Sequence, residues 1–120
     1  MKHTLSFTKM QGLGNDFIIM DGISQRFNDV DLSRLSIRLC DRHFGIGANG
    51  LIILEESKQS DFKMSIINSD GSIPEMCGNG IRCLATYIYD NELSRKTVFS
   101  VETLAGIIVP GLVIQDGKVV

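Results

Sequence analysis

One segment of the sequence concentrates the residue types that can carry out chemistry. It runs from residue 68 to residue 83 and reads NSDGSIPEMCGNGIRC. Cys77 lies in its glycine- and asparagine-rich part, directly before an apolar stretch that predicts a helix. The first turn of a helix offers unpaired N–H groups and a partial positive charge, and both lower the pKa of a nearby thiol. Cys77 is therefore our candidate for a base or nucleophile that acts on an anionic small molecule.

The helical spacing separates Cys77 from the other cysteines. Cys77 precedes Ile81 by four residues, so we expect its thiol on the inward stripe of the predicted helix. Cys83 comes six residues after Cys77, which turns it by about 240° around the helix axis. Cys40 lies at the edge of the apolar stripe of an earlier predicted helix. Core packing is the usual role of such cysteines, and we expect it for Cys40 and Cys83.

Two other site classes fit the sequence poorly. Cys40, His43, Cys77 and Cys83 lack the paired short spacings of zinc motifs, so we expect no metal. The segment 45–50 reads GIGANG and matches the dinucleotide-binding pattern in letters alone. That pattern requires a strand before it and a helix after it, whereas here a helix pattern precedes and a strand pattern follows. We interpret this segment as a structural turn.

Asn15 and Asn68 each lie at a junction between a predicted strand and a loop. Asn15 follows the Gly12-Leu13-Gly14 sequence, and Asn68 precedes Asp70-Gly71. Loop asparagines usually form turns, since they tolerate unusual backbone angles and bond their own backbone. Spacing alone therefore leaves their role open between turn formation and ligand binding.

The elements that must position these residues alternate between strands and helices. Residues 31–41 and 78–90 read as helices. Strands are predicted at 5–10, 16–20, 51–55, 62–67, 97–102, 106–109 and 112–115. The glycine-rich residues 11–15 join the first two strands, which favours a hairpin.

The helix predicted at 78–90 is apolar around most of its circumference. Its main stripe consists of Ile81, Leu84, Ala85 and Ile88. Cys83, Tyr87 and Tyr89 extend the apolar surface, and Arg82 and Thr86 form the interior polar edge. A helix of this kind is usually buried on several sides. We therefore expect an α+β fold in which a curved, mixed or antiparallel sheet wraps around this central helix.

Composition narrows the class of protein. The chain has 120 residues, a net charge of −2 and 43% hydrophobic residues, which fits one folded domain without a nucleic-acid or membrane partner. No apolar run approaches membrane-spanning length. Three cysteines without framework spacing favour a reducing cytoplasm. Asp116-Gly117 predicts a hairpin turn with only three residues after it, so we expect the chain to be a piece of a longer protein.

Three motifs resemble a known family. Residues 7–17 (FTKMQGLGNDF), 41–47 (DRHFGIG) and 68–83 are similar to the N-terminal motifs of diaminopimelate epimerases. The resemblance implies a cofactor-independent enzyme that interconverts L,L- and meso-diaminopimelate for lysine and peptidoglycan synthesis. It implies two similar α/β domains, each a curved sheet around a central helix, with the active site between them. Residues 1–120 would be the N-terminal domain.

The resemblance also implies roles for individual residues. Cys77 matches the first catalytic cysteine, and Gly78 and Asn79 match the backbone pair that holds the substrate carboxylate. Asn15 and Asn68 match asparagines that hold the polar groups of the substrate. The partner cysteine of the family lies in its C-terminal half, so this chain alone is expected to be inactive. The family often has Asp at the position of Asn49, and some members have Gln at that of Gly50, so contacts from this loop stay open.

Three alternatives stay open from the sequence. The first is a related cofactor-independent amino-acid racemase with another substrate. The second is a non-catalytic, stand-alone binding domain in which Cys77 is structural. The third, a thiol redox switch, is disfavoured because no resolving cysteine is suitably placed. A lone half would expose its inter-domain surface, so self-association into a homodimer is also open.

Overall fold

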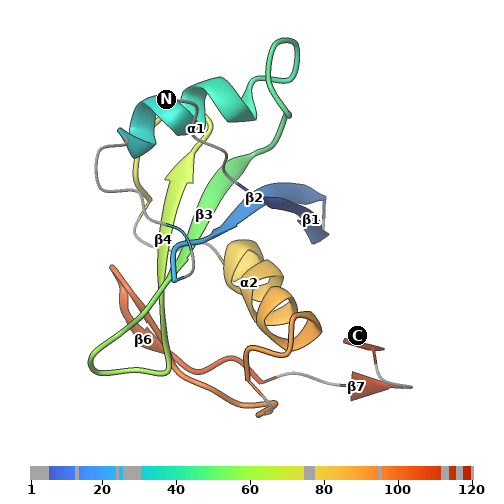
Figure 1. Ribbon diagram of the computed structural model, residues 1–120, viewed down its shortest axis with the longest axis vertical. Coiled ribbons are helices and arrows are strands. Elements are labelled where there is room, and N and C mark those ends of the chain that lie inside the picture. The colour runs from blue at the N-terminus through green and yellow to red at the C-terminus, as the bar shows by residue number, and fades with distance from the viewer. Residues whose placement is uncertain are drawn as a thin grey trace.

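One mixed β-sheet carries the two helices of the described part of the chain (Figure 1). The computed structural model describes residues 6–12, 14–23, 25, 31–74, 78–94, 96–111, 114–115 and 118–119. The strands of the sheet are β1 (Thr8–Gly12), β2 (Asn15–Asp21), β3 (Gly50–Glu55), β4 (Phe62–Asn68), β5 (Val101–Thr103) and β6 (Gly106–Ile108). The helices are α1 (Leu32–Cys40) and α2 (Gly78–Asp90), and a separate hairpin pairs β7 (Ile114–Gln115) with β8 (Lys118–Val119).

The strands follow one another across the sheet in the order of the sequence, from β1 to β6. The pairs β1–β2, β3–β4 and β5–β6 are antiparallel, whereas β2–β3 and β4–β5 are parallel. A parallel pair needs a long crossover, and α1 and α2 lie in these two connections. The α+β class and the mixed sheet predicted from the sequence are confirmed.

The two helices cover opposite sides of the sheet. Successive residues of a strand face opposite sides, and β3 is buried on both. We call the two sides the α2 side and the α1 side, after the helix that packs there. The α2-side core consists of Phe17, Ile19, Ile52, Leu54, Phe62, Met64, Ile66, Ile81, Cys83, Leu84, Ala85, Ile88, Phe99 and Val101. The α1-side core consists of Ile18, Met20, Cys40, Ala48, Leu51, Ile53 and Ile67.

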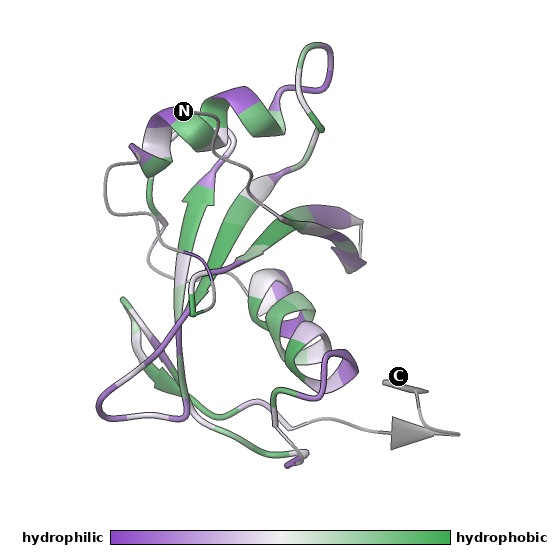
Figure 2. Cartoon of the chain, viewed as in Figure 1, coloured by the Kyte–Doolittle hydropathy of each residue, from purple (hydrophilic) through white to green (hydrophobic). Residues whose placement is uncertain are grey.

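The helix α2 is buried around most of its circumference, as its sequence predicts. It packs against β1, β2, β3 and β4, so the sheet wraps around it. Arg82 is exposed and Thr86 is partly buried, which matches the predicted polar edge. In the α2-side core, the rings of Phe62 and Phe99 meet edge to face with centroids 5.7 Å apart. Figure 2 shows that hydrophobic residues dominate the central strands of the sheet.

The helix α1 is shorter and has one apolar face. The carboxylate of Asp31 caps its first turn by accepting a hydrogen bond from the N–H of Arg34 at 3.2 Å. Its predicted core positions are confirmed: the leucines at 32, 35 and 39 pack against the α1-side core. Cys40, at the end of the helix, is 3% exposed. Cys83 is also 3% exposed, so both cysteines have the core role that we expected.

Several strand boundaries differ from the prediction. β1 covers Thr8–Gly12, whereas the predicted strand 5–10 lies partly outside the described residues. Gly12 pairs with Asn15, which confirms the hairpin and makes its connection shorter than predicted. The strand predicted at 97–102 is regular only over Val101–Thr103, because its partner β4 offers pairing positions there only at Phe62 and Lys63. β7 and β8 confirm the second hairpin, whose turn residues lie outside the described part.

Candidate functional site

Asn15 and Asn68 lie at the same end and on the same side of the sheet. Phe17, Gly50 and Asn68 form one row across β2, β3 and β4, and Asn15 lies two residues before Phe17. Phe17 belongs to the α2-side core, so the alternation of strand residues places Asn15 on that side. Asn68 shares it, because it follows Met64 and Ile66 at even spacing. From the spacing of strands and residues, the two Cα atoms are roughly 12 Å apart.

The start of α2 faces this end of the sheet. In Figure 1 the yellow beginning of α2 lies towards the end at which β4 terminates, and its orange end points away. Gly78 and Asn79 are the first residues of the helix, where N–H groups have no partner within the helix. Among the described residues beyond its own helix turn, no heavy atom lies within 4 Å of a Cβ built on Gly78. Cys77 precedes this turn and lies outside the described residues.

The backbone and side chain of Asn68 are held by a tight turn. Its N–H donates to the carbonyl of Ser72 at 2.8 Å, and its carboxamide nitrogen donates to the Ser72 hydroxyl at 3.1 Å. The Ser72 hydroxyl in turn donates to the Asp70 carboxylate at 2.5 Å. These bonds lower the pKa of Asp70, first through the hydroxyl and then through the Ser72 N–H. The turn at residues 69–72 therefore holds the backbone of Asn68 and gives its carboxamide one local partner at the end of β4.

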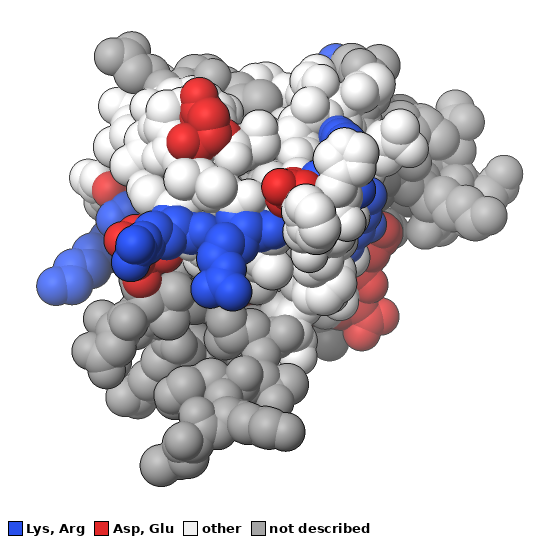
Figure 3. Space-filling view, turned by 90° about the horizontal axis from the view of Figure 1, so that it is seen from above, with Lys and Arg blue, Asp and Glu red and all other residues white. Residues whose placement is uncertain are grey.

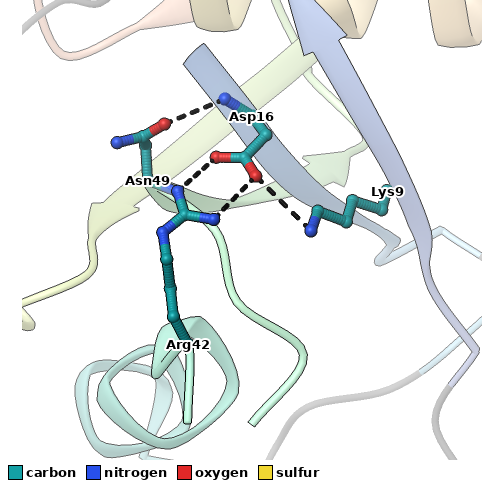
Figure 4. Close-up of polar contacts among 4 residues, drawn as sticks. All are labelled: Lys9, Asp16, Arg42 and Asn49. Atoms are coloured by element: carbon teal, nitrogen blue, oxygen red, sulfur yellow. Dashed lines mark hydrogen bonds and ion pairs between the residues drawn. The ribbon is translucent and has the colours of Figure 1, made fainter.

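Behind the site, on the α1 side, Asp16 is the centre of a polar cluster (Figure 4). Its carboxylate accepts two hydrogen bonds from the Arg42 guanidinium, at 2.8 and 3.1 Å, and pairs with the Lys9 ammonium at 3.4 Å. Asn49 adds reciprocal bonds: its N–H donates to the Asp16 carbonyl at 2.8 Å, and its side-chain oxygen accepts from the Asp16 N–H at 3.0 Å. We call these four residues the Asp16 clamp.

The charges of the Asp16 clamp strongly affect the pKa of Asp16. The pKa of Asp16 is lowered to about 2, mainly by the hydrogen bonds from Arg42, against an opposing contribution from burial. The side chain of Asp16 is only 15% exposed, whereas those of Lys9 and Arg42 are 40% and 55% exposed. The side-chain oxygen of Asn49 accepts a hydrogen bond from within the protein, from the Asp16 N–H, and so helps to hold this loop against β2.

Hydrogen bonds within the loop between α1 and β3 hold Arg42 and Asn49 in position. The Asp41 carboxylate accepts hydrogen bonds from the N–H groups of His43 and Phe44, which lowers the pKa of Asp41. The N–H groups of residues 46 and 47 both bond to the carbonyl of Leu39, and Gly47 has a φ of 84°. A left-handed backbone at this position favours glycine. The segment 45–50 is thus the structural turn that we expected from its sequence.

The two described cysteines do not resemble acid–base groups. Burial raises the pKa of the Cys40 thiol, which lies in the α1-side core. Cys83 lies in the α2-side core, on the part of α2 that faces the sheet. Across the described residues, no group of three or more His, Cys, Asp or Glu side chains could hold a metal ion.

The remaining surface features lie away from the two asparagines. A cavity of about 560 Å³ lies on the α1 side, between the start of α1, β4 and β5, so the sheet separates it from the α2 side. A band of Lys and Arg crosses the face seen in Figure 3, and Arg34 and Arg38 are the exposed cations of α1. No helix in the described part of the chain is long and apolar enough to cross a membrane.

Sequence reasoning missed the Asp16 clamp as a unit. Its members lie far apart in the chain: Arg42 comes 26 residues after Asp16 and Asn49 comes 33 residues after it. Asp16 and Arg42 belong to two of the three sequence motifs noted above. Arg42 lies in the loop between α1 and β3, so no spacing along the chain pairs it with Asp16, and membership of these two motifs is the signal that the sequence offers.

Comparisons with known proteins agree with this fold. The family model for diaminopimelate epimerase matches residues 7–120. A diaminopimelate epimerase of Caldanaerobacter subterraneus subsp. tengcongensis is 52% identical over 115 residues, which cover 96% of this chain and 40% of that protein. One from Halothermothrix orenii is 55% identical over 115 residues, covering 94% of this chain and 40% of that protein. The chain thus spans about two fifths of the length of these relatives.

Solved structures share the architecture at low sequence identity. A methylitaconate-delta-isomerase aligns with a TM-score of 0.76 and 15% identity over 96% of this chain and 36% of that chain. A hydroxyproline epimerase from Agrobacterium vitis aligns with a TM-score of 0.72 and 14% identity over 94% of this chain and 38% of that chain. These likenesses show the fold alone. Because the family model matches nearly the whole of this chain, the chain belongs to the diaminopimelate epimerase family.

Proposed function

We propose that this chain supplies one half of the active site of a diaminopimelate epimerase. The observation that carries the proposal is the common location of Asn15, Asn68 and the start of α2 at one end and on one side of the sheet. These are the positions at which the sequence motifs place the substrate-binding groups. We propose that residues 1–120 form the N-terminal domain of the enzyme and that the longer relatives contain the domain that completes the site.

The proposed substrate contacts follow from the hydrogen-bonding groups at this end of the sheet. The N–H groups of Gly78 and Asn79 would hold the α-carboxylate of the substrate, because the positive end of a helix favours an anion. The carboxamides of Asn15 and Asn68 would bind the other polar groups of L,L- or meso-diaminopimelate. A carboxamide both donates and accepts, so it suits a substrate with ammonium and carboxylate groups.

The proposed reaction moves one proton at the α-carbon. The Cys77 thiolate takes the α-proton and becomes a thiol, and the electron pair left on carbon is shared with the carboxylate. The helix N–H groups stabilise this developing charge while the closed site excludes water. A thiol on the opposite face then donates a proton and inverts the centre. We propose that this second thiol belongs to the C-terminal domain and that the reaction needs no cofactor.

The setting of the reaction is also a proposal. Its product would enter lysine and peptidoglycan synthesis, and the three cysteines without framework spacing support a cytoplasmic location.

A chimera tests the proposed function. The chain is joined at residue 120 to the corresponding remainder of the Caldanaerobacter relative and incubated with L,L-diaminopimelate in deuterated water. We expect meso product that carries deuterium at the α-carbon. Cys77→Ser should reduce turnover at least about 100-fold, because it removes the acid–base group. Cys83→Ala, in the buried core, is the matched control and should stay within a few-fold of the parent.

Two further measurements sharpen this test. Gly78→Ala should fold normally, since an added Cβ meets no described neighbour within 4 Å, but should raise KM by obstructing the carboxylate. The 120-residue chain alone should form no meso product; deuterium incorporation together with meso product would contradict the proposed division of the site. A folded chimera that neither exchanges the proton nor epimerises the substrate would contradict the function itself.

A further inference from the structure

Asp16 lies between two residues that face the candidate site, yet its own side chain points to the other side of the sheet. Asn15 and Phe17 face the α2 side, and the Asp16 carboxylate joins Arg42 and Lys9 on the α1 side (Figure 4). Asp16 therefore cannot touch a substrate held beside α2. Its extensive contacts call for a different role.

We propose that Asp16 is a positioning residue, which through Arg42 and Asn49 fixes the carboxamides of Asn15 and Asn68 at the end of the sheet. This proposal rests on the function proposed above and adds a residue to it. It is carried by two chains of contacts that start at Asp16, one along β2 and one across to β4.

The contact with Asn15 is direct, along the backbone. Asn15 is the first residue of β2, and strand ends are prone to fray. The next residue, Asp16, has its N–H, its carbonyl and its carboxylate all bonded to the Asn49 loop and to Arg42. The backbone at Asp16 therefore cannot rotate without breaking several bonds, so the Cα–Cβ direction of Asn15 is fixed.

The contact with Asn68 passes through Asn49. The carbonyl of Asn49 accepts a hydrogen bond from the N–H of Ser69 at 3.1 Å, one residue after Asn68. The buried Ser36 hydroxyl bonds to the Asn68 carbonyl at 2.9 Å from the other direction. The peptide groups on the carboxyl side of Asn68 are thus held by the clamp and by α1 together.

The ion pair between Asp16 and Arg42 is the strongest interaction in the Asp16 clamp. The guanidinium binds both carboxylate oxygens, at 2.8 and 3.1 Å, a geometry that orients the two groups as well as attracting them. Lys9 and Arg42 together face the single carboxylate of Asp16. Asp16→Asn keeps the shape of the side chain and leaves these cations without their anion, so it isolates the contribution of the charge.

Side-chain NMR on the 120-residue chain tests the proposal without any assay of activity. In the parent, the carboxamide NH₂ groups of Asn15 and Asn68 should have high order parameters. In Asp16→Asn both should lose order, while the backbone amides in the middle of α2 keep theirs. Arg42→Gln, which changes an exposed side chain, is the second variant if Asp16→Asn folds poorly. Unchanged order at both carboxamides in a folded variant would overturn the proposal.

Asp61 provides a matched control at the opposite end of β4. Like Asp16, it accepts a backbone hydrogen bond, from the Ser100 N–H at 3.0 Å, and it pairs with Lys96 at 3.8 Å. Asp61→Asn should therefore also remove an ion pair and a charged acceptor, but leave the order of both asparagine carboxamides unchanged. If Asp61→Asn disorders them equally, the effect is general loosening of the sheet and the positioning role is wrong.

Kinetics in the chimera separate this proposal from the function on which it rests. Asp16→Asn should raise KM about tenfold with little change in kcat, the loss expected when one or two hydrogen bonds to the substrate weaken. Asp61→Asn should change neither parameter. An inactive parent chimera would contradict the proposed function, and the NMR order parameters would then decide the role of the clamp by themselves. An active chimera in which Asp16→Asn keeps the parental KM would contradict the positioning role.

Discussion

At the scale of single residues, the carboxylate of Asp16 couples the stability of the fold to pH. Its pKa of about 2 lies below the usual value of 3.8, because Arg42 and Lys9 favour the charged form. A carboxyl group whose pKa is lower in the folded state stabilises that state above its unfolded pKa. The contribution is lost as the pH falls from about 4 towards about 2.

We therefore expect the effect of Asp16→Asn on stability to depend on pH. Near pH 7 the variant should unfold with a free energy lower by at most about 2 kcal/mol, since the charge-assisted bonds are lost. Near pH 2 the difference should be small, because the parent carboxyl group is then about half protonated in the folded state and almost fully protonated in the unfolded state. Urea denaturation of both proteins across this range measures the difference directly.

The comparison with the variant is needed because other carboxyl groups also titrate. Hydrogen bonds hold the pKa values of Asp61, Asp70 and Glu102 below their usual range, so the parent loses stability in acid for several reasons. Only the difference between the two proteins reports on Asp16. A difference that stays constant with pH would show that the charge of Asp16 does not stabilise the fold.

At the scale of the elements, a buried serine joins α1 to the end of β4. Ser36 is fully buried, and its hydroxyl lies 2.9 Å from the carbonyl of Asn68 and 3.3 Å from that of Ile67. A buried polar group without a partner is costly, so this contact fixes where α1 sits along β4. The helix thus supports the site from the opposite side of the sheet.

We expect Ser36→Ala to lower the free energy of unfolding by about 1–2 kcal/mol, although alanine is the better helix former. Ser33→Ala on the same helix is the control, because it makes the same change at a partly exposed position. Hydrogen exchange should show faster opening at the end of β4 in the Ser36 variant. Equal stability of the two variants would contradict the anchoring role.

The elements also show how far the sequence predicts the fold. The helix predicted at 78–90 is α2, because Ile81, Leu84, Ala85 and Ile88 recur at the helical period and are all buried on one side of it. The strand predicted at 62–67 is β4. Buried and partly buried residues alternate along it from Phe62 to Ile66 as expected, whereas Ile67 is buried on the α1 side. The ends of β1 and β5 were less predictable, since a strand stops where its neighbour stops offering partners.

The candidate site was predictable to the same extent. The motifs predict Asn15, Asn68, Gly78 and Asn79 as substrate-binding residues, and these roles stay predictions. The structure shows that the register of the strands brings the two asparagines to one side of the sheet. The Asp16 clamp and Ser36 could not be predicted, because they depend on contacts between loops and on which helix covers which side. The role of Cys77 stays a prediction, since this residue lies outside the described part of the structure.

At the scale of the whole molecule, one sheet lies between two hydrophobic cores and contributes residues to each of them. The residues of β3 contribute alternately to the α2-side and the α1-side core. The radius of gyration, 13.9 Å, is close to the roughly 13.6 Å expected for a compact domain of this length. Because neither core can be disrupted without exposing β3, we expect the sheet and both helices to unfold as one cooperative unit.

Two buried cysteines allow this cooperativity to be measured. Cys40 reports on the α1-side core and Cys83 on the α2-side core, and each is 3% exposed. In a Cys77→Ser background, Cys40→Ala and Cys83→Ala give two chains with one reporter thiol each. The rate of thiol labelling divided by the rate in the unfolded chain gives the equilibrium constant for opening. Its value in increasing urea gives the free energy of opening of each core.

For each single-thiol variant, the free energy of opening from thiol labelling should equal the free energy of unfolding of the same variant, measured by circular dichroism. The agreement should hold for both reporters at every urea concentration. The slope with urea should match that of global unfolding, because exposure of either thiol requires the sheet to open. If Cys40 is labelled at a free energy well below that of global unfolding, α1 detaches from the sheet by itself. In that case α1 could not hold Asn68 in place through Ser36, and the two sides of the sheet would act as separate units.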